Sequence, residues 1–157
     1  MNTMTLKAAA LIVAVALAPA AQAEPQHATA RTSDVIDRFN QAFVRHDASL
    51  LEGLVAEDCV MESVEGARVV GRDANLTLWQ NLANNRDGAF EVEDVVVLGD
   101  RANIRWSYHS GPGLSQSVRG VTLMRVRDGQ IVEAVAYAKT GDSSVAAAVR
   151  TASSESR

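Results

Sequence analysis

The hydrophobic positions of this chain change their period along the sequence. In the first part they recur every three or four residues, which is the spacing of an amphipathic helix. In the last part they alternate with polar residues, which is the spacing of a half-buried strand. Helices followed by an antiparallel run of strands predict an α+β fold. The pattern predicts helices over residues 33–45, 48–56 and 74–84, and strands over residues 58–64, 90–98, 102–109, 118–126 and 131–139.

The last two predicted strands carry the most informative pattern. Asp128-Gly129 separates them, and this dipeptide is a strong signal for a tight hairpin turn. Before the turn, Met124 alternates with charged residues and so points inward. Because protein cores are close-packed, a row of short side chains either receives bulk from elsewhere or leaves a cavity. We therefore expect a ligand pocket beside the short apolar residues that share the inward face of the last strand: Val132, Ala134, Ala136 and Ala138.

The two ends of the chain are expected to lie outside the folded domain. Lys7, an apolar run over residues 8–18 and the small-x-small site Ala21–Ala23 are typical of a cleaved signal peptide. The mature protein is then exported to the periplasm or the extracellular space and has no membrane span, and an uncleaved anchor is the alternative. The expected divisions are a signal peptide at 1–23, a linker at 24–32, the domain at 33–139 and a disordered tail at 140–157.

Charge and cysteine content exclude several classes of function. The formal net charge is −4 at pH 7. Removal of Lys7 with the signal peptide leaves 14 basic against 19 acidic residues, a net charge of −5. We therefore expect no binding to nucleic acid. Cys59 is the single cysteine, so no intramolecular disulfide can form, and its apolar surroundings predict a buried, inert thiol. No cluster of His, Cys or acidic residues has metal-ligand spacing, so neither a metal nor a cofactor is expected.

The order of the predicted elements, with GRDA at residues 71–74 and RGVTLMRVRDGQIVE at residues 119–133, resembles the SnoaL-like branch of the nuclear-transport-factor-2-like superfamily. The resemblance covers residues 33–139. It implies a cone-shaped, curved sheet of mixed or antiparallel strands wrapped around three N-terminal helices, with a pocket inside and a homodimer formed through the outer sheet face. Members include polyketide cyclases, ketosteroid isomerases, limonene-epoxide hydrolases and proteins with no known reaction. The fold therefore does not determine the function.

The catalytic carboxylates of these enzymes are replaced at the matching positions. By the resemblance, Ser63 stands after Glu62 where the isomerases have their aspartate base. Ser107 and Ala136 stand where the epoxide hydrolases have their two aspartates, and Ala136 also matches the region of the acidic group of the cyclases. Met61 and Ser63 match the residues that hold the hydrolytic water. The loss of these groups removes both the acid and the base of the known mechanisms.

Residues 103–109 have two possible orientations. Plain alternation places Ile104, Trp106 and Tyr108 in the core and their polar neighbours in water. The resemblance implies the reverse, because the arginine of the family lines the cone. Trp106, Tyr108 and Tyr137 would then form an outer apolar patch that a partner must bury. A shift of one residue in register exchanges the two orientations. We follow the resemblance and expect the cone to be lined by Arg105, Ser107 and His109.

In that orientation three residues are candidates for catalysis. His109 would act as acid or base, a role in which histidine is common. Arg105 would hold an anionic or enolate oxygen, and Glu62 would pair with either residue if it turns inward.

The leading hypothesis is nevertheless a cone that binds a small, largely apolar molecule without the usual carboxylates. One alternative is an isomerase, cyclase or hydrolase that uses the three candidates above. Another is a non-catalytic dimeric interaction module whose cone is filled by core side chains. The expected ligand-binding residues are Met61, Ser63, Trp79, Ser107, Met124, Ala134, Ala136 and Ala138.

Overall fold

The structure is a computed structural model that describes residues 23–139. The predictions of a signal peptide and of a disordered tail fall mainly on residues 1–22 and 140–157, which lie outside the described residues. The helical elements are α1 (Ala23–Val44), α2 (Arg72–Asn84) and the 3₁₀-helices η2 (Ala48–Leu51) and η3 (Pro112–Leu114). The strands are β1 (Val55–Glu62), β2 (Arg68–Val70), β3 (Ala89–Leu98), β4 (Arg101–Ser110), β5 (Gln116–Arg127) and β6 (Gln130–Lys139).

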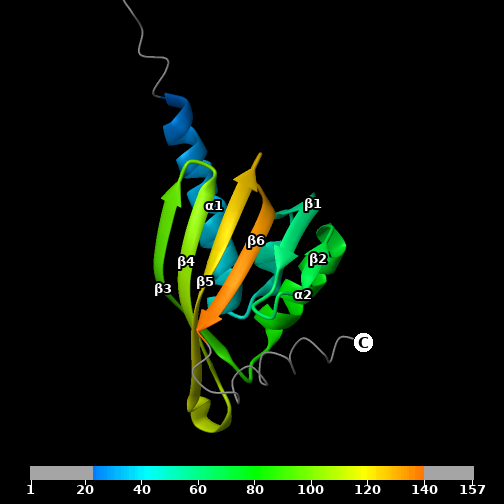
Figure 1. The fold of residues 1–157 in the computed structure, drawn as a ribbon, viewed down its shortest axis with the longest axis vertical. Helices are drawn as coiled ribbons and strands as arrows, with labels where there is room; N and C mark the ends of the chain where they lie inside the picture. The colour runs from blue at the N-terminus through cyan, green and yellow to red at the C-terminus, as the bar shows by residue number, and fades with distance from the viewer. Residues whose placement is uncertain (1–22, 140–157) are drawn as a thin grey trace, which may run out of the picture.

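The six strands form one mixed sheet in the order β2-β1-β6-β5-β4-β3. The β1–β6 pair is parallel and the other pairs are antiparallel. Both α-helices lie on the same side of the curved sheet (Figure 1), where α1 packs against β3 and β4, and α2 against β1 and β2. This arrangement confirms the predicted α+β class.

The hydrophobic core fills the space between these helices and the inner face of the sheet. Helix α1 presents one apolar stripe to it, as its helical spacing predicts. Leu51 of η2 and Ile131 of β6 belong to the same core. The largest apolar side chains that are almost completely buried are Ile36, Leu51, Leu54, Val55 and Ile131.

The prediction of three helices is wrong, because residues 48–56 do not form an α-helix. A single turn of 3₁₀-helix ends at Leu51, and Gly53 then takes a φ of +75°, which interrupts any helix. Strand β1 begins at Val55, which pairs with Ile131 of β6. A short apolar run fits either a helix or a buried strand, and here the pairing with β6 decides.

The segment expected as a linker, residues 24–32, is part of α1 in the structure. Thr32 is buried. The Thr29 hydroxyl accepts a hydrogen bond of 3.0 Å from the Gly99 backbone N–H in the β3–β4 turn. The β3–β4 turn therefore contacts the first half of the helix. The apolar pattern of the helix alone does not indicate this contact. The short strand β2, which pairs with β1, was also not predicted.

Asn75 joins α2 to the two strands beside it. Its side chain is fully buried, and its Nδ2 lies 3.2 Å from the Cys59 carbonyl and 2.7 Å from the Gly71 carbonyl. The Gly71 N–H donates to the same Cys59 carbonyl. Gly71 has a φ of +96°, a conformation that favours glycine, so the GRDA segment begins with a turn that places α2 against β1.

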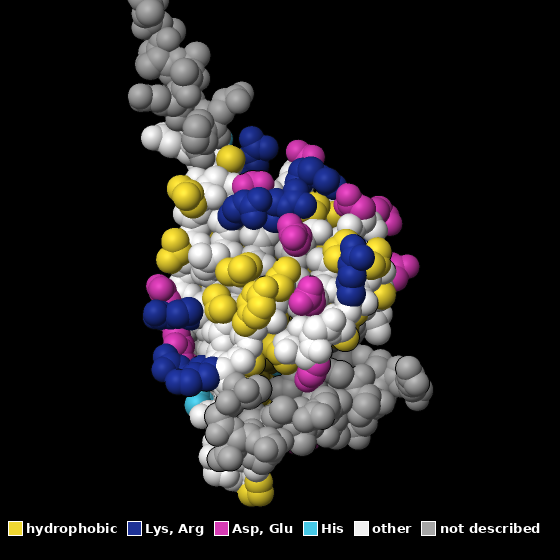
Figure 2. Space-filling model, viewed as in Figure 1, with side chains coloured by type: hydrophobic (Ala, Val, Ile, Leu, Met, Phe, Trp, Pro, Cys, Tyr) yellow, Lys and Arg dark blue, Asp and Glu magenta, His cyan; other side chains and the backbone are white. Residues whose placement is uncertain are grey.

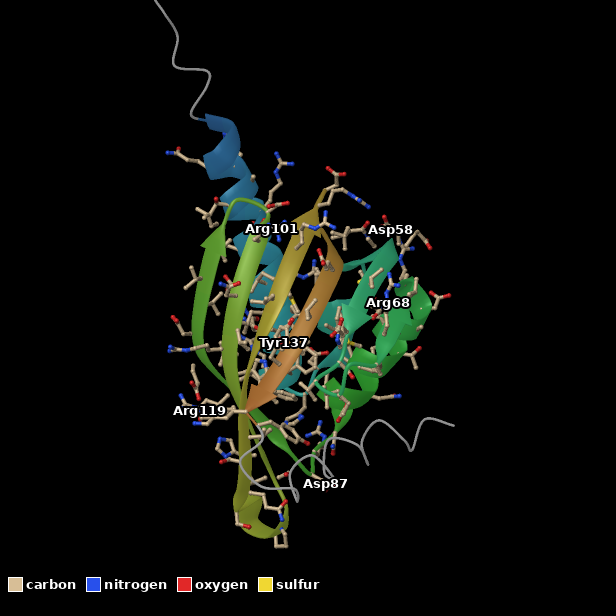
Figure 3. All side chains as sticks on the ribbon, in the orientation of Figure 1. Asp58, Arg68, Asp87, Arg101, Arg119 and Tyr137 are labelled. Atoms are coloured by element: carbon tan, nitrogen blue, oxygen red, sulfur yellow. The ribbon has the colours of Figure 1, made fainter. Side chains whose placement is uncertain are left out.

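The outer face of the sheet carries an apolar patch that is surrounded by charged side chains. Figure 2 shows hydrophobic side chains gathered near the middle of this face, and Figure 3 shows Tyr137 among them. Tyr137 is 54% exposed and Leu123 is 40% exposed. Their cross-strand partners Val121 and Val135 face the same side. We call these four residues the outer patch.

Candidate functional site

A cavity of about 510 Å³ lies between the two α-helices and the inner face of the sheet. The chain has three Phe, two Trp and two Tyr residues, and all of these except Tyr137 line the cavity. The aromatic content is therefore concentrated in one place. The six aromatic residues of the wall are Phe39, Phe43, Trp79, Phe90, Trp106 and Tyr108.

The sheet side of the cavity is floored by short side chains, as the sequence predicts. Ala134, Ala136 and Ala138 all line it. On the neighbouring strand they pair in order with Met124, Thr122 and Gly120. Because none of the three alanines reaches far above the backbone, the opposing helices do not meet the sheet here and space remains.

Met61, Ser63, Trp79 and Met124 also line the cavity, at the positions expected for ligand-binding residues. Whether they contact a ligand stays a prediction. The Ser63 hydroxyl is already engaged in the β1–β2 turn, because it donates to the Glu65 carboxylate and accepts from the Ala67 N–H, both at 3.2 Å.

Charged side chains reach the cavity only at its mouth. Among the described residues that line it, Glu65 and Asp73 are the charged ones, and both are exposed. They lie where the β1–β2 turn faces the first turn of α2. The deeper wall is therefore apolar or neutral.

Two aromatic residues bring polar atoms to that deeper wall. The Trp106 Nε1–H donates to the Thr122 hydroxyl at 2.9 Å. The Tyr108 hydroxyl accepts from the Asn85 amide at 3.4 Å. Burial, together with the negative charge of Asp87, raises the pKa of Tyr108 above its usual value, so its phenol stays protonated at neutral pH. These groups can form neutral hydrogen bonds but cannot act as a base there.

The predicted orientation of β4 is wrong. Ile104, Trp106 and Tyr108 line the cavity, and Arg105, Ser107 and His109 do not. The alternation of apolar and polar residues determines the orientation, since burial of two aromatic rings is favourable and burial of an unpaired guanidinium is costly. The resemblance placed Arg105 inside the cone, and that expectation fails for this chain.

The displaced residues form polar contacts outside the cavity. Arg105 lies 3.7 Å from the Asp94 carboxylate. The His109 Nε2 lies 3.6 Å from the Glu91 carboxylate and 3.3 Å from the Ser107 hydroxyl. The same imidazole nitrogen faces both partners, so the three do not form a relay in which a carboxylate orients the ring from its other nitrogen. Ser107, which was expected to bind ligand, is buried beside His109 instead.

Glu62 also lies outside the cavity. It is exposed at the end of β1, whereas its neighbour Met61 points inward. The three catalytic candidates are therefore not brought together with the ligand-binding candidates.

Several wall residues were missed by the sequence analysis. Phe39 and Phe43 were interpreted only as core positions of the first helix, and Phe90 and Val92 only as parts of a strand. All four line the cavity. The alternation of Phe90 and Val92 with acidic residues is a signal for their inward orientation, and it would have found them.

The remaining reactive groups offer no further chemistry inside the cavity. Burial raises the pKa of the Cys59 thiol to about 11, so it is uncharged at neutral pH. Among residues 23–139, no group of three His, Cys, Asp or Glu side chains is placed to hold a metal ion. Neither helix in this range combines the length and apolar character needed to cross a membrane.

Comparison with known proteins gives the same fold. The SnoaL-like domain family matches residues 36–134. An NTF2-like protein of unknown function from Mesorhizobium loti is 44% identical, with a TM-score of 0.67 over 71% of this chain and 93% of that one. The search among curated proteins gave no match.

Two more distant structures share the fold alone. A putative polyketide cyclase from Xanthomonas campestris pv. campestris is 21% identical, with a TM-score of 0.60 over 80% of this chain and 98% of that one. An LEH-like epoxide hydrolase from M. tuberculosis is 20% identical, with a TM-score of 0.59 over 73% of this chain and 86% of that one. The sequence match and the mixed sheet together make this chain a member of the SnoaL-like family with an NTF2-like fold.

Proposed function

We propose that this SnoaL-like protein binds a small, largely apolar molecule in its cavity, without the catalytic carboxylates usual in the family. The observation that carries the proposal is the composition of the wall, which is aromatic and aliphatic in its depth and charged only at its mouth. The cavity volume of about 510 Å³ is within the range of roughly 300–1,000 Å³ that is common for small-molecule sites.

The same wall argues against acid–base chemistry by the candidates named from the sequence. A general acid or base must reach the reacting atom within hydrogen-bond distance. Arg105, His109 and Glu62 are on the other side of the strands that form the wall. The carboxylates at the mouth, Glu65 and Asp73, are exposed to water. They therefore lack the burial by which such enzymes raise the pKa of a catalytic carboxylate.

The proposal predicts that a larger side chain at Ala136 excludes the ligand. Ala136 lies in the middle of the floor, so Ala136→Phe fills the space that the alanines leave open. Both tryptophans of the chain line the cavity, and their fluorescence therefore reports its occupancy. We expect quenching by the neutral probe N-phenyl-1-naphthylamine to be saturable in the wild type and weakened at least about tenfold in the variant, a loss of about 1.4 kcal/mol.

Val135→Phe is the matched control, because it adds a phenyl ring to the adjacent residue on the opposite face of β6. It should bind the probe as the wild type does. Unchanged affinity in Ala136→Phe, with its fold intact by circular dichroism, would show that the cavity is not the binding site.

We also propose that the protein is exported, on the evidence of its N-terminal sequence pattern. Expression of the full chain in a Gram-negative host should then yield a periplasmic protein whose mass corresponds to a chain that begins at Glu24. Ala23→Phe, which places a large residue at the cleavage site, should leave the chain unprocessed. A wild-type protein that keeps Met1 and stays in the membrane fraction would support the anchor instead.

A further inference from the structure

The Trp106 side chain packs over a glycine of the neighbouring strand. Gly120 of β5 lies directly opposite it in the β4–β5 pair. A Cβ atom added at Gly120 would lie 2.3 Å from the Cζ2 atom and 2.5 Å from the Cη2 atom of the indole. The benzo part of the indole therefore occupies the space above the glycine.

The same ring makes two further contacts. The Nε1–H donates to Thr122 at 2.9 Å, two residues further along β5. The Phe90 ring meets the indole in a T-shaped contact, with centroids 5.9 Å apart and planes at 70°. The hydrogen bond and the ring contact fix the indole in one orientation. Its polar atom has a partner within the protein.

Part of the indole remains accessible to a ligand. Trp106 is only partly buried, although its neighbours Ile104 and Tyr108 are buried, and it lines the cavity. Gly120 pairs with Ala138 of β6, whose short side chain also lines the cavity. The cavity thus presents part of an indole whose orientation is fixed within the protein.

We infer that the ligand carries an uncharged aromatic ring and that this ring lies against the part of the Trp106 indole that borders the cavity. The inference rests on the proposed function, since it names the class of molecule that the cavity takes. An aromatic ring gains more here than a saturated ring of the same size, because aromatic pairs in offset or edge-to-face geometry attract each other beyond the burial of their surface. The absence of charged side chains from the deeper wall of the described cavity favours a neutral ring over an ionised one.

The test compares naphthalene with decalin, which has the same two-ring skeleton in saturated form. The association constant of each compound is divided by its alkane–water partition coefficient. This correction removes the difference in hydrophobicity between the two compounds from the comparison. We expect naphthalene to be preferred about two- to tenfold by the wild type. Trp106→Leu should abolish the preference while still binding both compounds.

Tyr137→Leu is the matched control, because it removes the one aromatic ring that lies outside the cavity. It should keep the wild-type preference. Should Trp106→Leu fail to fold, the wild type still gives a direct measurement by NMR. Naphthalene should shift the Trp106 ring protons upfield by its ring current, and decalin should not.

The failures are distinguishable. Equal corrected affinities for the two compounds, or a preference that survives in Trp106→Leu, would overturn the inference and leave the proposed function standing. If neither of the two compounds nor the naphthylamine probe binds, the proposed function itself is overturned.

Discussion

Asn75 shows how one buried polar residue fixes the position of a helix. Its amide lies within hydrogen-bond distance of carbonyls from β1, β2 and the turn before α2, namely those of Cys59, Val69 and Gly71. Its Oδ1 atom is buried without a hydrogen-bond partner within the described protein. The Asn75 side chain therefore provides donors to backbone carbonyls of the neighbouring elements, because a buried carbonyl without a donor is costly.

Asn75→Ala should lower the free energy of unfolding by about 1–3 kcal/mol, because it leaves buried carbonyl groups with fewer donors. Urea denaturation measures the change. Asn84→Ala, an exposed asparagine at the end of the same helix, is the control and should stay within about 0.5 kcal/mol of the wild type. Equal stability of Asn75→Ala and the wild type would show that the amide is not a support of α2.

At the scale of the elements, β3, β4 and β5 carry a series of ion pairs outside the cavity. Arg105 pairs with Asp94 and Arg119 with Glu93, and the His109 imidazole lies 3.6 Å from the Glu91 carboxylate. The Arg119–Glu93 contact has two hydrogen bonds, one of them 2.7 Å long. The bonded Arg119 guanidinium holds the pKa of Glu93 below its usual value. Two of these contacts involve Arg105 and His109, which the sequence analysis proposed as catalytic residues.

Because the folded-state pKa of Glu93 is lowered, the pair stabilises the protein above the usual glutamate pKa. That contribution is lost as the pH falls through the lowered value, where the carboxylate becomes protonated. Arg119→Gln should therefore lower the melting temperature at pH 7, and the difference from the wild type should shrink towards pH 3. Arg68→Gln, at an exposed arginine of β2 for which the described residues provide no ion pair, is the control. A difference that is the same at both pH values would contradict this role.

The sequence predicts the type of most elements because their hydrophobic periods are clear. The strands β3 to β6 and the helix α2 lie within about two residues of the predicted ranges. The errors occur where local pattern is ambiguous or where distant contacts decide. Residues 55–56 are apolar and fit either a helix or a strand, and the pairing with β6 makes them a strand. The predicted orientation of β4 is wrong because the family position of Arg105 places that residue inside the cone, whereas the alternation of its neighbours places it outside. The floor of the cavity was predictable, since a row of alanines on an inward face is visible in the sequence.

At the scale of the whole molecule, the sheet separates two apolar surfaces. The inner one encloses the cavity, and the other is the outer patch, which Figure 2 shows framed by charged side chains. We expect a homodimer formed through this outer face. The four side chains of the outer patch are too few for a typical interface of about 800 Å² per partner, so the surrounding charged residues would take part in it.

Tyr137→Glu combined with Leu123→Glu should convert this dimer to a monomer. The two carboxylates of one protomer would be buried in the interface against the same two carboxylates of its partner. Size-exclusion chromatography with light scattering gives the mass. Val44→Glu is the control, since Val44 is 51% exposed at the end of α1, on the opposite side of the sheet from the patch. A wild-type protein that is monomeric at high concentration, or a doubly substituted protein that remains dimeric, would contradict the prediction.

The alanine floor has a consequence for how this protein could diverge. Ala134 is packed into the hydrophobic core, whereas Ala136 and Ala138 are only partly buried and border the hollow. Exchanging one of them for valine or leucine would reshape the interior by a few carbon atoms and leave every helix contact in place. Ligand size in this lineage can therefore drift by single substitutions on one strand, at little cost to folding.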